Sequence, residues 1–134
     1  MKNNRIIKGI VAPHKGNGRK FGYPTANIDV STDIEEGVYA GFTTLKFNKL
    51  KYNNMPSFIF IGKAETLGET DLRLEAHIFD IEDQDLYGAE LEVTLVKKIR
   101  DNKKFENVEK LLYQIHLDEL DARKILAKND RHSN

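Results

Sequence analysis

The chain contains no cysteine, no excess of either charge and no long apolar run, and each absence excludes a class of function. Without cysteine, its 134 residues can form no disulfide, no thiolate metal site and no cysteine nucleophile. The 21 basic and 21 acidic side chains give a net charge of zero, which leaves no overall positive field for nucleic acid or an anionic membrane. No segment approaches the roughly 20 apolar residues that a membrane-spanning helix needs. We therefore expect a cytoplasmic monomer without nucleic-acid or membrane partners, in which a local site holds any anionic ligand.

The pattern along the chain predicts a single domain, residues 1–134, in which residues 129–134 form a polar tail. It shows no internal repeat, low-complexity tract or linker. Strand-like runs dominate the first three-quarters, and turn residues rather than helical patterns separate them. This favours an antiparallel sheet or barrel over alternating strands and helices. A strand is expected to start near Thr25, and the other predicted strands cover residues 5–12, 37–47, 55–61, 72–80 and 90–99.

The last quarter changes period and predicts one amphipathic helix over residues 108–128. Its apolar residues recur near every 3.6 positions. Asn107 is suited to be the N-cap, and Glu109 places a negative charge in the first turn. We expect this helix to close one side of the sheet or barrel.

The most informative segment is Gly-Arg-Lys-Phe-Gly-Tyr-Pro-Thr-Ala-Asn, residues 18–27. Its glycines let backbone N–H groups approach an anion closely, and Arg19 and Lys20 supply positive charge. Thr25 and Asn27 stand two positions apart on an expected strand, so their side-chain oxygens project to the same side and can reach one hard cation. The segment suggests a magnesium–nucleotide site. Taken alone, a Thr-x-Asn pair beside proline is more often only a capped turn.

The alternating strand over residues 72–80 offers a candidate base. Leu72, Leu74, Ala76 and Ile78 form one face, and the other face carries Arg73, Glu75, His77 and Phe79. One interpretation is a half-exposed strand whose polar face meets water. Beside a phosphate-binding loop, however, Glu75 could accept the proton of a substrate hydroxyl as phosphate is transferred.

The segment 18–28 and six further landmarks occur in the order found in riboflavin kinases, and the chain resembles that family over most of its length. Residues 18–28 are similar to the family signature G-R-x-L-G-F-P-T-A-N-I. The remaining landmarks are Gly9-Ile10-Val11, Gly37-Val38-Tyr39-Ala40, the segment Leu74-Glu75-Ala76-His77-Ile78-Phe79-Asp80, the turn Leu86-Tyr87-Gly88, residues 99–105, and a C-terminal helix with Gln114 and Asp118.

The resemblance implies both a fold and an activity. The fold is a mainly β, six-stranded antiparallel Greek-key β-barrel with a C-terminal α-helix. The activity is phosphorylation of the ribityl 5′-hydroxyl of riboflavin by ATP, giving FMN and ADP. Bacterial members often carry an adenylyltransferase domain before the kinase domain. Because the first strand starts so early in this chain, we expect no such domain here.

The resemblance also implies which residues form the site. Glu75 would be the catalytic base, and Thr25 and Asn27 would bind the Mg²⁺, or another divalent cation, that accompanies ATP. The expected ATP contacts are Gly18, Arg19, Thr25, His77 and Tyr87, and the expected flavin contacts are Arg100, Lys103 and Phe105.

Two alternatives remain open from the sequence. Residues 60–68 depart from the family's pattern, with Phe60 in place of an asparagine and Glu65 in place of a proline. That departure supports a flavin- or nucleotide-binding module on the same scaffold with weakened catalysis. Residues 100–104 could also be only a solvated turn before the helix.

Overall fold

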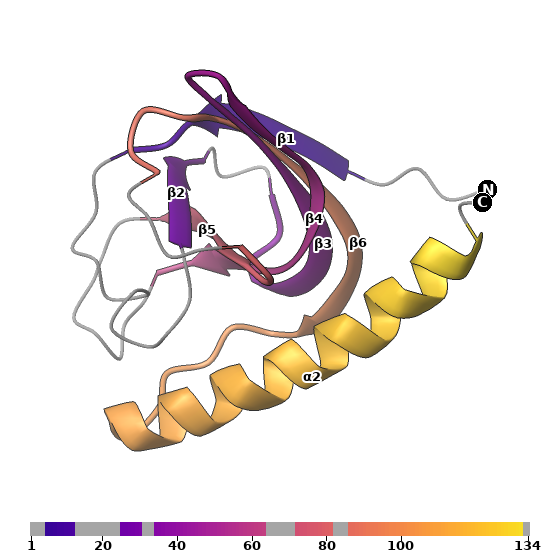
Figure 1. Ribbon diagram of the computed structural model, residues 1–134. Coiled ribbons are helices and arrows are strands. Elements are labelled where there is room, and N and C mark those ends of the chain that lie inside the picture. The colour runs from indigo at the N-terminus through magenta and orange to yellow at the C-terminus, as the bar shows by residue number, and fades with distance from the viewer. Residues whose placement is uncertain (1–4, 13–24, 31–33, 64–71, 82–85, 133–134) are drawn as a thin grey trace.

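The architecture is that of a computed structural model, which describes residues 5–12, 25–30, 34–63, 72–81 and 86–132. Six strands precede one long helix (Figure 1). The elements are β1 Arg5–Ile10, β2 Thr25–Asp29, β3 Gly37–Phe47, β4 Leu50–Gly62, β5 Arg73–Ile78, β6 Glu90–Arg100 and α2 Val108–His132.

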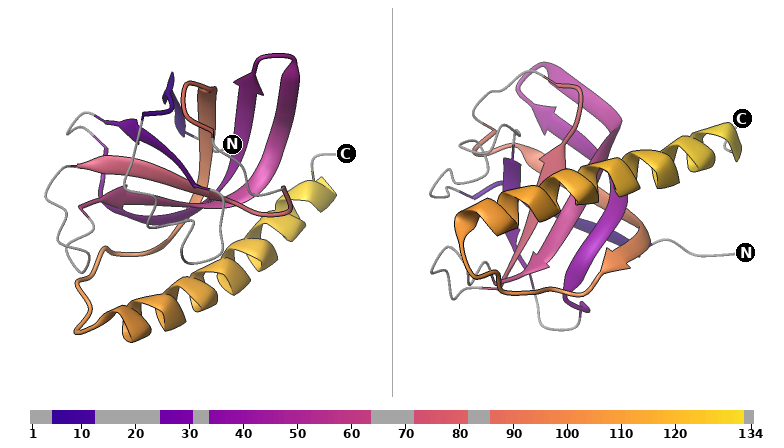
Figure 2. Two further views of the ribbon diagram at one scale, coloured as in Figure 1. Left: turned by 60° about the vertical axis from the view of Figure 1, so that its left-hand side comes forward. Right: turned by 90° about the horizontal axis from the view of Figure 1, so that it is seen from below.

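The six strands form one antiparallel sheet in the spatial order β1-β6-β3-β4-β5-β2. Strands β3, β4 and β5 follow one another directly, and β6 returns to lie beside β3, which is the Greek-key arrangement. The sheet curves into a half-barrel, with α2 running across its outer face (Figures 1 and 2). The predicted mainly β Greek-key fold with a C-terminal helix is therefore confirmed.

The two faces of the sheet bury two separate apolar clusters. The inner cluster fills the half-barrel and includes Ile28, Leu74, Ala76 and Ile78, so one face of the predicted alternating strand lies in the core. The outer cluster lies under α2. It joins Val38, Ala40, Phe58 and Phe79 of the strand layer to Ile115, Ala122 and Leu126 of the helix.

Close strand approach at Gly41 helps the sheet to curve. The register between β3 and β6 shifts between Ala40 and Gly41, which marks a β-bulge. A Cβ atom added at Gly41 would lie 2.4 Å from the backbone carbonyl oxygen of Thr94. Only glycine allows the two strands to come this close at the bulge.

Strand β4 begins five residues before the predicted start at residue 55. Asn48 adopts a φ of 56°, which permits a two-residue turn between Phe47 and Leu50. The hairpin therefore continues outward through the polar stretch 50–54, which the sequence pattern did not mark as a strand. Figure 2 shows this hairpin projecting from the sheet.

The helix begins as predicted and ends later. The side-chain oxygen of Asn107 accepts a hydrogen bond from the backbone N–H of Lys110 at 2.9 Å, which confirms Asn107 as the N-cap. The helix continues to His132 rather than ending at Lys128, so most of the predicted polar tail is helical. The sequence did not mark the end of the helix, because residues 108–132 contain no glycine or proline. In the described part of the chain, no helix has the length and apolarity to cross a membrane.

Backbone hydrogen bonds outside the ladders draw three segments together at one end of the half-barrel. The Val11 N–H donates to the Ala89 carbonyl at 2.9 Å, and the Gly88 N–H donates to the Val11 carbonyl at 3.0 Å. The Ala12 N–H donates to the Asn27 carbonyl at 2.8 Å. The turn around Gly88, the end of β1 and the middle of β2 therefore form one connected region.

Candidate active site

Four side chains predicted as site residues lie side by side on the outer face of β2 and β5. In the antiparallel register, Thr25 is the direct partner of His77, and Asn27 is the direct partner of Glu75. Direct cross-strand partners project to the same face, with Cβ atoms about 4.5–5.5 Å apart. The strand alternation noted in the sequence therefore produces a compact two-by-two group of polar side chains.

This group is buried. Glu75 is 7%, His77 5% and Asn27 4% exposed, and Thr25 is partly buried. The alternative in which the polar face of β5 meets water is therefore wrong for Glu75 and His77. Sequence alternation reports which residues share a face, but not what covers that face.

Strand β4 flanks the group with aromatic rings. Its register sets Phe58 beside His77 and Phe60 beside Glu75. The rings of Phe58 and His77 are stacked, with centroids 4.3 Å apart and planes 12° apart. Both phenylalanines belong to or pack against the outer cluster under α2, so the helix indirectly supports the site.

Asn27 carries the feature that best fits a cation. Its side-chain oxygen Oδ1 is buried and has no hydrogen-bond partner among the described residues. A buried carbonyl oxygen without a partner is costly, at about 1–3 kcal/mol, and neutral oxygens of this kind are ligands that hard cations accept. Among the described residues, no group of three or more His, Asp or Glu side chains gathers as an alternative metal site.

The second predicted group, Arg100, Lys103 and Phe105, lies where β6 leads into α2. Arg100 is paired in a bidentate manner with Asp118, through Nε to Oδ1 at 2.9 Å and Nη2 to Oδ2 at 2.8 Å. Its Nη1 donates to the backbone oxygen of Asp101 at 3.1 Å. Asp118 is fully buried and also accepts a hydrogen bond from Gln114 at 3.0 Å. Arg100 therefore ties the loop after β6 to the helix.

Two cations lie near the ring of Phe105. The Arg100 guanidinium lies 5.6 Å and the Lys103 ammonium 5.4 Å from the centre of its ring, within the range of cation–π attraction. Phe105 is 9% exposed, whereas Asp101, Lys103 and Lys104 are exposed, so the alternative of a solvated turn over residues 100–104 stays open.

A charged network fixes the start of the same loop. The Lys98 ammonium donates to Asp101 Oδ1 at 2.6 Å and also to Glu35 Oε2. These hydrogen bonds, that to Asp101 first, raise the pKa of Lys98, and the bond to Lys98 lowers the pKa of Asp101. The Tyr39 hydroxyl donates to the Glu35 backbone oxygen at 2.7 Å, and burial together with Glu35 raises the pKa of Tyr39.

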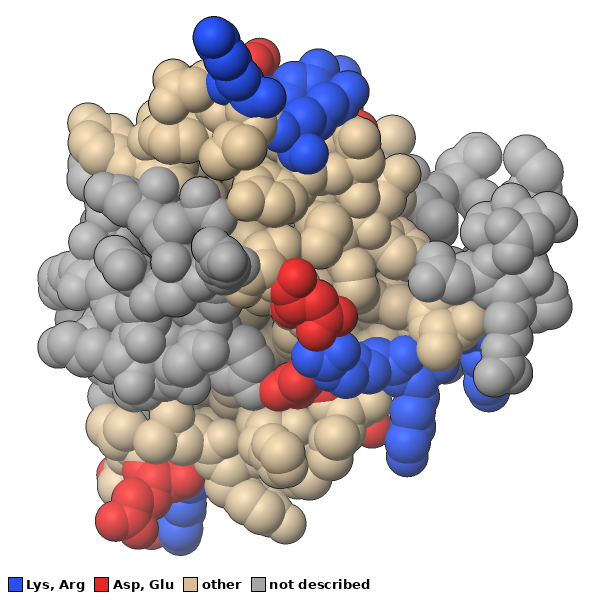
Figure 3. Space-filling view, viewed as in Figure 1, with Lys and Arg blue, Asp and Glu red and all other residues tan. Residues whose placement is uncertain are grey.

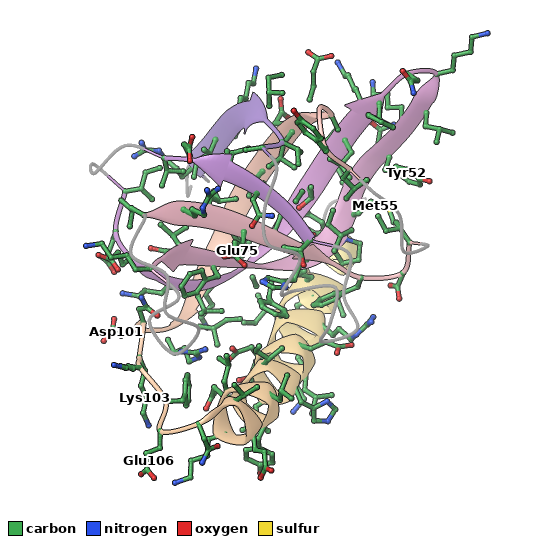
Figure 4. All side chains as sticks on the ribbon, turned by 90° about the vertical axis from the view of Figure 1, so that its left-hand side faces the viewer. Tyr52, Met55, Glu75, Asp101, Lys103 and Glu106 are labelled. Carbon is green, nitrogen blue, oxygen red and sulfur yellow. The ribbon has the colours of Figure 1, made fainter. Side chains whose placement is uncertain are left out.

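The buried polar group on β2 and β5 and the residues at the end of β6 are separate, but one row of strand partners connects them. The row runs Asn27, Glu75, Phe60, Val38, Arg100 across five adjacent strands. At about 4.8 Å between strands, Glu75 and Arg100 are roughly 14 Å apart along the sheet. Figure 4 shows Glu75 on the sheet and Lys103 on the loop that leads to α2, whereas Tyr52 and Met55 lie toward the β3–β4 hairpin.

The remaining predicted contacts are placed only in part. Tyr87 is exposed and lies on the turn that is hydrogen-bonded to the end of β1. Gly18 and Arg19 lie outside the described residues, as does most of the divergent segment 60–68.

On the described part of the face in Figure 3, acidic and basic side chains are interspersed, in keeping with the net charge of zero.

Sequence reasoning missed two residues that shape the site. Phe58 was not singled out because its role depends on β4 lying beside β5. Asp118 was noted only as part of the helix pattern. Its position within a buried helical face is unusual for a carboxylate, and that signal could have pointed to a cationic partner.

Comparison with known proteins decides the family. A family model described as Flavokinase, riboflavin kinase, matches residues 1–126. The chain belongs to the riboflavin kinase family.

Two relatives with known names agree with the match. The chain is 35% identical over 123 residues to a bifunctional riboflavin kinase/FMN adenylyltransferase of Escherichia coli K12, covering 90% of this chain and 38% of that protein. It is 34% identical over 115 residues to the RNA-binding riboflavin kinase RibR of Bacillus subtilis, covering 84% of this chain and 47% of that protein. It therefore spans less than half the length of either relative.

A solved structure supports the fold. Riboflavin kinase from Trypanosoma brucei superposes with a TM-score of 0.70 at 22% sequence identity, covering 92% of this chain and 80% of that one. At this identity the likeness concerns the fold alone.

Proposed function

We propose that this riboflavin kinase family chain phosphorylates the ribityl 5′-hydroxyl of riboflavin with ATP, giving FMN and ADP. The observation that carries the proposal is the buried group on β2 and β5. It sets Glu75, a carboxylate residue, at the strand position opposite Asn27, whose buried Oδ1 has no hydrogen-bond partner among the described residues. A base and a neutral oxygen ligand side by side are what transfer of a phosphoryl group to a hydroxyl requires.

Glu75 acts as the general base in this proposal. Its carboxylate accepts the proton of the riboflavin hydroxyl as that oxygen bonds to the γ-phosphorus and the bond from phosphorus to the ADP oxygen breaks. The residue is 7% exposed, so bulk water has little access to compete with the substrate hydroxyl. General-base catalysis of this kind contributes about 10²–10⁴-fold in rate.

Thr25 and Asn27 would hold Mg²⁺, or another divalent cation, with the triphosphate. When bound, the cation neutralises charge on the phosphates during transfer. Thr25 Oγ1 and Asn27 Oδ1 are neutral, so they leave the cation's charge available to the phosphate oxygens and water. Among the residues that the structure describes, Oδ1 is buried without a hydrogen-bond partner, which fits this role because a cation would satisfy it.

The flavin would lie on the side of the loop after β6. Lys103 and Phe105 offer a cation and a ring there, and Arg100 fixes the loop to the helix. A substrate that reaches from this loop to Glu75 must be elongated, because about 14 Å of sheet separate them. Riboflavin, with a tricyclic ring and a ribityl chain, has such a shape.

The nucleotide contacts of Gly18, Arg19, His77 and Tyr87, the monomeric state and the cytoplasmic location stay predictions. So does the absence of a nucleic-acid partner. The divergent segment after Phe60 favours one second candidate, a flavin- or nucleotide-binding module with weakened turnover.

The test is direct. Purified chain is incubated with riboflavin, ATP and Mg²⁺, and the products are separated by chromatography. FMN that accumulates with time and disappears when Mg²⁺ is omitted supports the kinase. Flavin binding without any FMN supports the binding module instead.

A further inference from the structure

His77 lies between Thr25, the proposed cation ligand, and Glu75, the proposed base. Its Nδ1 is 3.5 Å from Thr25 Oγ1, and its Nε2 is 3.6 Å from Glu75 Oε1. The first distance is at the limit of a hydrogen bond and the second is slightly beyond it. Contacts between catalytic groups are often this long without substrate and shorten when it binds.

The neighbours of His77 favour one placement of its proton. An ionised carboxylate can only accept, so the Nε2 that faces Glu75 is the nitrogen that carries hydrogen. In the neutral ring Nδ1 is then an acceptor, and the Thr25 hydroxyl donates to it. This directs the hydrogen of Thr25 toward His77 and leaves its oxygen lone pairs for a cation.

The ring has little freedom to change this arrangement. It is 5% exposed and is stacked on Phe58 with planes 12° apart. Phe58 in turn lies 6.0 Å from Phe79, and the Arg123 guanidinium of α2 covers the Phe79 ring at 4.5 Å. Arg123 also pairs with Asp80 at 3.3 Å, at the end of β5. A continuous set of contacts therefore runs from the helix to the imidazole.

We propose that His77 is a positioning residue that orients the Thr25 hydroxyl toward the cation and the Glu75 carboxylate toward the substrate hydroxyl. This inference rests on the proposed function. It differs from a direct contact between His77 and ATP, because both ring nitrogens face protein groups and one ring face lies against Phe58. One side chain would thereby couple metal binding to base orientation.

Two substitutions separate the two contacts. In His77→Asn, the side-chain amide takes roughly the position of Nδ1, so the contact with Thr25 is kept and the contact with Glu75 is lost. In His77→Gln, the longer side chain places its amide at roughly the position of Nε2, so the contact with Glu75 is kept and the contact with Thr25 is lost. For each variant, kcat is measured at saturating Mg²⁺–ATP, and the Mg²⁺–ATP Kd is measured by calorimetry without riboflavin. The matched controls are His116→Asn and His116→Gln, on the exposed side of α2.

The expected results are opposite for the two variants. His77→Asn should lower kcat about tenfold or more and change the Kd little, since a hydrogen bond to a charged group is lost. His77→Gln should raise the Kd about threefold to tenfold, since a neutral hydrogen bond is lost, and should lower kcat less than His77→Asn. Equal proportional losses in both variants, or none in either, would overturn the proposal.

Failure of the proposed function can be told apart from failure of this inference. If the wild-type chain forms no FMN, the kinase proposal fails, and the Mg²⁺–ATP titrations still test the Thr25 contact. In that case, equal Kd values for His77→Asn and His77→Gln would overturn the inference. A melting temperature unchanged from wild type in both variants makes the comparison a test of positioning rather than of folding.

Discussion

Asn27 combines burial with an unsatisfied side-chain oxygen, and this combination separates a functional residue from a structural one. A residue retained for stability would have its oxygen hydrogen-bonded in the folded chain. The Oδ1 atom of Asn27 has no such partner among the described residues, so its burial costs free energy without a bound ligand.

We therefore expect Asn27→Leu to weaken function without weakening the fold. Leucine is similar in volume and removes the unpartnered oxygen, so the free energy of unfolding should stay the same or rise by up to about 1 kcal/mol. Mg²⁺–ATP binding, measured by calorimetry, should weaken. Thr25→Val should weaken it as well, and a variant pair that binds Mg²⁺–ATP as tightly as wild type would leave both residues purely structural.

Sequence spacing could predict these residues but not their surroundings. Thr25 and Asn27, like Glu75 and His77, stand two positions apart on a strand, which places each pair on one face. Their meeting depends on β2 lying beside β5, which are far apart in the sequence. The stacking of Phe58 on His77 depends on the same non-local pairing, and neither could be read from local periodicity.

At the scale of single elements, the loop after β6 is held by the helix that follows it. Arg100 uses three nitrogens on Asp118 and the Asp101 backbone, which leaves Lys103 as the more available cation beside Phe105. The family resemblance implied both Arg100 and Lys103 as flavin contacts, because the sequence does not reveal that Arg100 pairs with the buried carboxylate of Asp118.

This arrangement predicts different effects for the two cations. Arg100→Ala should destabilise the fold, by less than the about 3–5 kcal/mol of a fully buried pair because the guanidinium is partly exposed, and should weaken riboflavin and FMN binding alike. Lys103→Ala should weaken FMN more than riboflavin. Flavin fluorescence titrations measure both, and a loss confined to FMN in Arg100→Ala would assign the phosphate to the arginine instead.

The bulge between β3 and β6 gives a prediction about the sheet itself. Gly41→Ala would place a methyl group 2.4 Å from the Thr94 carbonyl oxygen, so strand β3 or β6 must shift. We expect a loss of about 1–3 kcal/mol in the free energy of unfolding, measured with denaturant. Gly9→Ala is the control, because the atoms nearest to its methyl group belong to the Ile28 side chain, at 3.1 Å, rather than to the backbone, so the change should cost less.

At the scale of the whole molecule, the two faces of the half-barrel have different roles. Its inner face holds an apolar core, and its outer face carries both the buried polar group and the helix that supports it. The Greek-key order brings β2 and β5 together at one edge, so the site depends on the complete sheet. The family resemblance predicted a six-stranded Greek-key arrangement, although not the order of its strands, whereas composition and periodicity alone predicted only an antiparallel sheet or barrel.

The central claim is that Glu75 is the base of a riboflavin kinase, and Glu75→Gln tests it most directly. Glutamine keeps the size and hydrogen bonding of the side chain but cannot accept the proton. FMN formation at saturating riboflavin and Mg²⁺–ATP should fall about 10²–10⁴-fold, while the affinities for both substrates stay close to those of wild type. A correctly folded Glu75→Gln chain that forms FMN at nearly the wild-type rate would contradict the account.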